Sequence, residues 1–134
     1  MKVVILCAAI FFTTTATADQ IQSKCIKVEN LKGWALKERN TYELESDGFS
    51  IDTFYLNFGD PEKRDSWMSN DKYGARIPCL NFGTLICVKN GSPAQVMTWS
   101  LDDKLSKVIH ARHIDGDLFG GTMMMVGDNV GTCD

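Results

Sequence analysis

Short runs of alternating apolar and polar residues make up most of the chain, and turns rich in Gly, Asn and Asp separate them. Alternation with a period of two is typical of a β-strand that is buried on one face. Runs that recur about every 8 to 12 residues between such turns are typical of a β-sandwich or a small barrel. The predicted strands are residues 23–29, 48–58, 75–80, 85–89, 95–99, 105–114 and 119–126.

Two segments depart from this simple alternation. In 48–58 the apolar positions are odd up to Ile51 and even from Phe54 onward, which predicts a β-bulge near residues 52–53. A helix is plausible only at 35–45, but β-favouring residues inside that segment make a strand or irregular structure the better prediction.

We expect an all-β fold, an antiparallel meander of about seven or eight strands closed as a barrel or sandwich. Closure as a barrel is favoured because it removes exposed sheet edges. The side chains predicted to fill the interior are Trp34, Phe54, Leu56, Trp99, Ile109 and Met123 to Met125.

The first eighteen residues have the pattern of a secretory signal peptide. A lysine precedes ten apolar residues, and Ala16 and Ala18 form an A-x-A cleavage site before Asp19. The apolar run is about half the 20 residues that a membrane-spanning helix needs, so we expect no stable membrane anchor. The sequence thus predicts an exported protein, periplasmic or extracellular, with one β domain at 19–134.

Four cysteines remain after removal of this segment, and an even number in an oxidising compartment predicts disulfides. Cys79 and Cys87 flank a turn centred on Gly83, so they would lie opposite each other on a hairpin. Of the three possible connectivities we therefore prefer Cys79–Cys87 with Cys25–Cys133. Chain entropy gives about 2.6 kcal/mol for the short loop and about 4.7 kcal/mol for the long one. The sequence has no C-x-x-C pair, the spacing that is typical of a zinc site.

Charge and motif content exclude several functions. The chain has 14 basic and 17 acidic residues and no basic cluster, so we expect no nucleic-acid binding and no adsorption to anionic membranes. The sequence has no G-x-S-x-G elbow and no complete phosphate loop. The acids Asp102, Asp103, Asp115 and Asp117 fit turns better than a calcium loop. We expect no enzyme activity and no cofactor.

The two histidines, His110 and His113, are three residues apart in a predicted strand, which places them on opposite faces and disfavours a shared metal. We expect His110 to lie beside Arg112 on the solvent face. His113 would end the strand near Asp115.

The segment 60–76 is the longest without a strand pattern, and it is rich in charge. It also contains Arg64, Trp67, Met68 and Tyr73, and Trp, Tyr and Arg are favoured anchors of protein interfaces. These four residues are the predicted binding site. In the alternative interpretation, Trp67 folds over one mouth of the barrel as a lid.

The spacing of cysteines and turns along the chain resembles that of a known class of proteins. A cysteine soon after the signal, a C-x(7)-C hairpin and the terminal Gly131-Thr132-Cys133 resemble those of small exported bacterial proteins. The layout is also similar to that of the barrel inhibitors of C-type lysozyme. The resemblance implies a bacterial periplasmic barrel and assigns no functional residue.

We therefore expect a non-enzymatic domain that binds another extracytoplasmic protein, with inhibition as one form of this function. The alternatives are a small-molecule carrier that uses the barrel interior, and an enzyme whose Asp or His groups meet only on folding. An open cavity would favour the carrier, and a full core with an exposed Trp67 loop would favour the protein binder.

Overall fold

The computed structural model describes residues 24–49, 52–116 and 120–134, so the predicted signal peptide lies outside the described residues. The described part forms β-strands and one 3-10 turn, with no α-helix in these ranges. The strands are β1 (Lys24–Lys37), β2 (Leu44–Phe49), β3 (Phe54–Phe58), β4 (Trp67–Ser69), β5 (Ile77–Asn81), β6 (Thr84–Lys89), β7 (Gln95–Leu101), β8 (Lys107–Ile114) and β9 (Gly121–Thr132).

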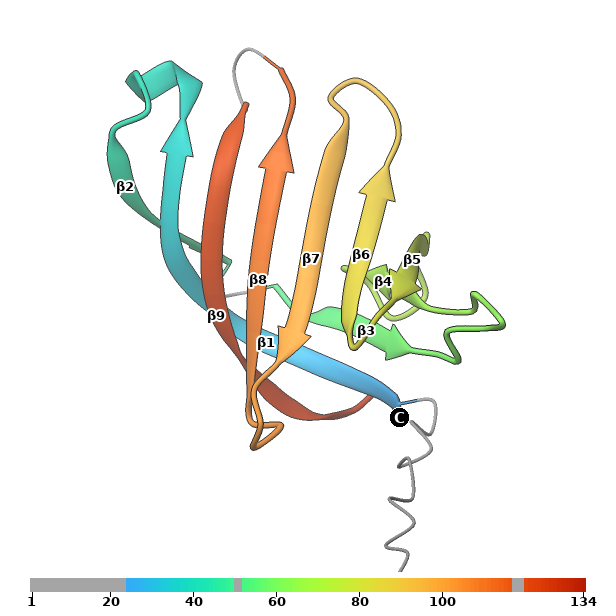
Figure 1. Cartoon of the computed structure of the whole chain (residues 1–134). Helices are drawn as coiled ribbons and strands as arrows, with labels where there is room; N and C mark the ends of the chain where they lie inside the picture. The colour runs from blue at the N-terminus through green and yellow to red at the C-terminus, as the bar shows by residue number, and fades with distance from the viewer. Residues whose placement is uncertain (1–23, 50–51, 117–119) are drawn as a thin grey trace, which may run out of the picture.

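The strands form one closed antiparallel barrel. Each strand from β3 to β9 pairs with the next along the chain, β1 pairs with β3, and β9 returns to pair with β1. Eight strands thus close the barrel, and β2 is an additional strand beside β1 (Figure 1). The all-β prediction and the barrel closure are confirmed.

Strand β1 is long and bent, and it pairs with different neighbours along its length. Lys24–Val28 pairs with β3, whereas Leu31–Leu36 pairs with β2. Between these parts the register against β9 shifts and Asn30 has a φ of 58°, the geometry of a β-bulge. In Figure 1, β1 crosses the lower part of the view and then turns upward beside β9.

The single strand predicted at 48–58 is wrong. Its apolar phase change marks the passage from β2 to β3, and residues 52 and 53 lie outside both strands. The segment 35–45 is strand up to Lys37, then a 3-10 turn at Glu38–Asn40, then β2 from Leu44. This agrees with the preference for strand or irregular structure there.

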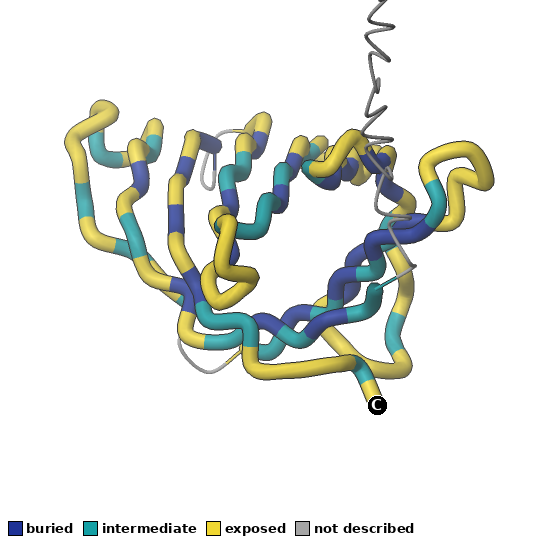
Figure 2. The backbone as a smooth tube through the Cα atoms, turned by 60° about the horizontal axis from the view of Figure 1, so that its bottom comes forward, coloured by how far each residue is buried: buried dark blue, intermediate teal, exposed yellow. Residues whose placement is uncertain are grey.

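Trp99 lies at the centre of the core. Its indole is fully buried, with the Phe54 ring 5.3 Å away and the His110 ring stacked on it at 3.7 Å between centroids. Leu56, Met123 and Met125 are also buried, as predicted. Figure 2 shows buried and exposed positions alternating along the strands that surround this core.

Four positions were assigned to the wrong face. Trp34, Ile109 and Met124 were predicted inside but are 55%, 44% and 62% exposed, and His110 was predicted outside but is 2% exposed. The cause is the strand phase, because Val108 and His110 face inward in β8 and leave Ile109 outside. Opposite faces for the two histidines are confirmed, since His113 is exposed.

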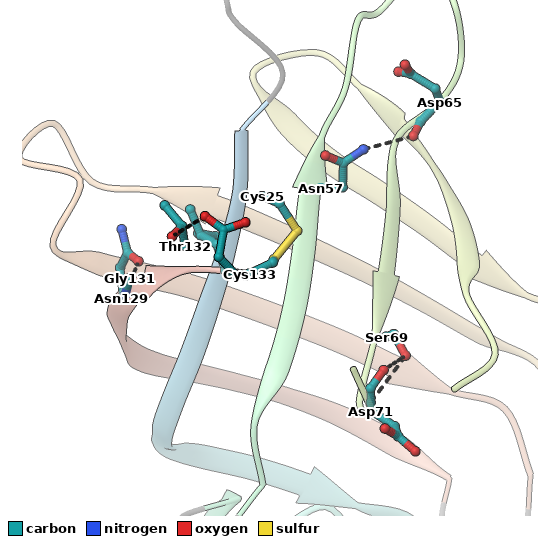
Figure 3. The surroundings of a disulfide bond; sticks show 11 residues. Cys25, Asn57, Asp65, Ser69, Asp71, Asn129, Gly131, Thr132 and Cys133 are labelled. Atoms are coloured by element: carbon teal, nitrogen blue, oxygen red, sulfur yellow. Dashed lines mark hydrogen bonds between the residues drawn. A yellow bond between two sulfur atoms is a disulfide. The ribbon is translucent and has the colours of Figure 1, made fainter. Parts of the chain in front are cut away.

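Both preferred disulfides are confirmed. Cys79 and Cys87 are direct partners in the β5–β6 register, and the loop between them contains Gly83 at a φ of 82°. Cys25 at the start of β1 is bonded to Cys133 after β9 (Figure 3). Two disulfides indicate an oxidising, extracytoplasmic environment.

Candidate functional site

The predicted binding segment 60–76 is divided by a strand that the sequence did not reveal. Strand β4 (Trp67–Ser69) pairs with both β3 and β5, so the residues before and after it lie at opposite ends of that strand. Arg64 is exposed on the first side and Tyr73, at 89% exposure, on the second. The structure therefore does not bring these two predicted site residues together.

Trp67 and Met68 point to opposite faces of β4. Met68 is 3% exposed and faces the interior. Trp67 is half-buried, and the Arg76 guanidinium lies 4.0 Å from its ring centroid. Because Trp67 alternates with an inward-facing residue, it covers the outside of the barrel wall, and the lid interpretation is wrong.

A different polar cluster lies inside the barrel, at the end where β1 and β8 finish and β7 and β9 begin, and these strand ends are uppermost in Figure 1. Arg112 occupies the inward phase of β8, two residues beyond His110, and its guanidinium lies 5.8 Å from the Phe49 ring centroid. Inward-facing strand positions are normally apolar. A half-buried arginine at this position is therefore the feature that needs a functional explanation.

Arg112 lines two neighbouring cavities. The first, here called the upper cavity, has a volume of about 370 Å³, and the second has about 190 Å³. Arg112 and Gln95 border both of them. The upper cavity combines these polar groups with apolar walls, and it is lined by Lys37, Asp47, Phe49, Pro93, Gln95, Arg112, Ile114 and Met123.

Lys37 forms ion pairs with two acids, Asp47 of the upper cavity and nearby Glu45, and Arg39 also pairs with Glu45. The Nζ of Lys37 lies 2.7 Å from Glu45 Oε1 and 2.7 Å from Asp47 Oδ2, and hydrogen bonds to Asp47 and Glu45 raise the pKa of Lys37. Burial raises the pKa of Asp47, but hydrogen bonds from Lys37 and the Gly48 N–H outweigh it and leave that pKa lowered. Asp47 is thus an ionised, paired carboxylate.

Arg112 has no such partner. Among the described residues, no carboxylate lies within 4.0 Å of its guanidinium, and its buried Nε has no hydrogen-bond partner. Burial lowers the pKa of Arg112, and the more distant Asp47 opposes that shift. The guanidinium stays protonated at neutral pH because its ordinary pKa is far above 7. It is therefore a partly desolvated cation that can donate two hydrogen bonds to one anion.

A third cavity of about 420 Å³ lies at the other end of the barrel, beside the β5–β6 and β7–β8 turns. It is lined by Asp102, whose Oδ1 accepts hydrogen bonds from the backbone N–H groups of Ser106 at 2.7 Å and Lys107 at 2.9 Å. These bonds lower the pKa of Asp102 and confirm its predicted turn role. Asp117 lies outside the described residues.

Sequence reasoning missed Arg112, Lys37, Asp47, Phe49 and Gln95. The two faces of β8 are similarly polar in sequence. One consists of Lys107, Ile109, Ala111 and His113, and the other of Val108, His110, Arg112 and Ile114. The one available indication was Val108 and Ile114 at both ends of the second face. This indication was too weak to set against Ile109, the large apolar residue on the other face.

Across the described ranges, no group of three or more His, Cys, Asp or Glu residues could hold a metal ion. No helix in the described part of the chain is long and apolar enough to cross a membrane. Comparison with protein-family models, curated proteins and solved structures gave no match.

Proposed function

We propose that this protein is a non-enzymatic, extracytoplasmic binding protein that holds a small anion in the upper cavity. The observation that carries the proposal is Arg112, a partly buried guanidinium without a carboxylate partner among the described residues. Burying a cation costs free energy unless a partner compensates it. A bound anion would supply that compensation.

The cavity also limits the ligand class. Its volume of about 370 Å³ is at the lower end of the range for small-molecule sites. Phe49, Ile114 and Met123 offer apolar contacts beside the guanidinium. The ligand that fits both features is a small carboxylate with a compact apolar or aromatic group. Two disulfides and the predicted signal peptide support a site of action outside the cytoplasm.

The test is a titration of the purified, oxidised protein with benzoate and hexanoate, followed by NMR of the Arg112 Nε–H and the Gln95 amide. Benzyl alcohol and hexanol are the neutral comparisons, and inorganic phosphate tests for an anion without an apolar part. We expect saturable shifts with a carboxylate, and a Kd at least about tenfold weaker in Arg112→Gln, because hydrogen bonds to charged groups contribute about 1.5–3 kcal/mol.

Arg76→Gln is the matched control, because Arg76 lies on Trp67 outside the barrel and borders neither cavity. It should bind like the unmodified protein. Equal binding of the alcohols, or unchanged carboxylate binding in Arg112→Gln, would contradict the proposal.

Protein binding remains the second candidate function, and exposed Tyr73 favours it. Tyr73 lies in the turn between Ser69 and Ala75, and both of these border the second cavity. A protein partner could therefore engage this turn at the rim of the upper end. A pull-down from the producing cells' envelope and medium, with Trp67→Ala and Tyr73→Ala as variants, tests this function. Retention of the same partners by both variants would argue against it. Inhibition of a lysozyme stays a prediction.

A further inference from the structure

The register of the sheet places apolar side chains in rows on the outside of the barrel. Trp34 is a direct neighbour of Met124 across the β1–β9 pairing, and Met124 is a neighbour of Ala111 across β8–β9. One row further, Val126 pairs with Ile109. Figure 1 shows that β2, β1, β9 and β8 lie side by side as one wall.

We define the outer face as six of the large apolar residues that this wall exposes. Each is between 38% and 64% exposed, and they are Trp34, Leu36, Leu44, Ile109, Met124 and Val126. Together they expose on the order of 600 Å², at the upper end of the about 300–600 Å² that the largest apolar patch on a typical monomer covers. The outer face is thus larger than scattered surface hydrophobics would explain.

The outer face is also nearly uncharged. Antiparallel sheets with one solvated face normally carry polar residues there. Among the outward positions of residues 32–36, 44–48, 109–113 and 122–126, Lys32 is the only Asp, Glu, Lys or Arg. Lys107 and Asp128 form an ion pair with each other at one edge of the outer face. An apolar centre with a polar rim is the usual anatomy of a protein interface.

We propose that two copies of this chain associate through the outer face as a symmetric dimer. In a two-fold interface the same patch meets itself, so a charged patch would repel its copy. The whole chain has a net charge of −3, yet Lys32 is the only Asp, Glu, Lys or Arg among these outward positions. The exposed area is about three quarters of the about 800 Å² that each partner contributes to a standard interface.

Trp34 and Met124 are the expected centre of the contact. They are neighbours in the register, and Trp and Met are enriched in interfaces. The dimer would leave the upper cavity accessible, because the side chains of the outer face point away from the barrel interior. Dimerisation and anion binding can therefore be tested independently.

The experiment is sedimentation equilibrium of the purified, oxidised protein, from about 1 to 200 µM, a range that brackets a micromolar Kd. We expect twice the monomer mass at the upper concentrations. Met124→Lys and Leu44→Lys each place two like charges in the interface and should weaken dimerisation at least about 100-fold. Both side chains are more than 60% exposed, so the variants should keep the native circular dichroism spectrum.

Phe82→Lys is the matched control, because Phe82 is 74% exposed but lies on the β5–β6 turn away from the outer face. This variant should dimerise normally. In addition, Trp34 fluorescence should shift to the blue on concentration, and Trp34→Phe should abolish the shift.

Three results would overturn the proposal. The protein could be monomeric throughout the concentration range, or the two lysine variants on the outer face could dimerise as well as the unmodified chain. A monomer that co-sediments with neutral phosphatidylcholine vesicles, and loses this in Met124→Lys, would assign the outer face to a lipid surface instead.

Discussion

Stability should fall as the pH drops from about 6.5 to about 4, because His110 is buried in its neutral form. Burial is the main reason that the pKa of His110 is lowered from 6.5 to about 4, and nearby Arg112 adds to this shift. The Nδ1 of His110 lies 3.0 Å from the Thr98 carbonyl oxygen, a contact that opposes the shift only in part.

The sign of the effect follows from proton linkage. In this pH range the unfolded chain binds a proton at His110 more readily than the folded protein does, so acid favours unfolding. The stabilisation is complete above the unfolded pKa of 6.5 and decreases until the folded pKa of about 4 is reached. One pKa unit corresponds to about 1.36 kcal/mol, so the total loss is about 3 kcal/mol. About 2 kcal/mol of it should be lost by about pH 5.

The assay is urea unfolding of the oxidised protein at several pH values, compared with His110→Gln and His113→Gln. His110→Gln should lose most of the pH dependence between about pH 6.5 and 4.5. His113 is exposed, with its Nδ1 3.0 Å from the Thr122 hydroxyl, so His113→Gln should keep it. The lowered carboxyl pKa values of Asp47, Asp102 and Asp128 act mainly below about pH 4, and that of Glu45, whose ordinary pKa is 4.5, adds a smaller loss at the acid end of this range in all three proteins. If the free energy of unfolding of His110→Gln and the unmodified protein decreases in parallel, the reasoning is refuted.

Two further predictions concern covalent and steric constraints. Replacing Cys25 and Cys133 with serine should lower the free energy of unfolding by about 4.7 kcal/mol, and replacing Cys79 and Cys87 by only about 2.6 kcal/mol, because the first bond closes the longer loop. Urea unfolding of the two double variants measures both losses, and a larger loss for the Cys79 and Cys87 variant would contradict the prediction. Gly33→Val should destabilise the barrel by about 1–3 kcal/mol, since a Cβ at Gly33 would lie 1.9 Å from a carbonyl oxygen of β9, and an unchanged thermal midpoint would refute that close approach.

The candidate site shows where sequence reasoning stops. Phe49 and Arg112 are 63 positions apart in the chain, and nothing local relates them. They meet because β2 extends the wall formed by β1 and because β8 turns its Val108–Arg112 phase inward. Similarly, the short strand β4 was hidden in a charged segment, since three residues are too few to show alternation.

By itself, the sequence determined the local chemistry of this protein. Alternation and turn residues determined that it is an all-β chain, and the Cys79–Cys87 hairpin followed from two cysteines around Gly83. These features depend on neighbours a few residues apart, so a local pattern is sufficient to predict them.

Only the tertiary structure decided which phase of each strand faces inward. A period of two divides a strand into two faces, and when both are similarly apolar, as in β8, the pattern does not distinguish inside from outside. Barrel closure makes that choice for all strands together. It buried His110 beside Trp99, directed Arg112 toward the upper cavity, and left Trp34 and Met124 exposed on the outer face. The binding surfaces proposed for this protein therefore arise from strand pairing over long sequence separations, which local patterns do not encode.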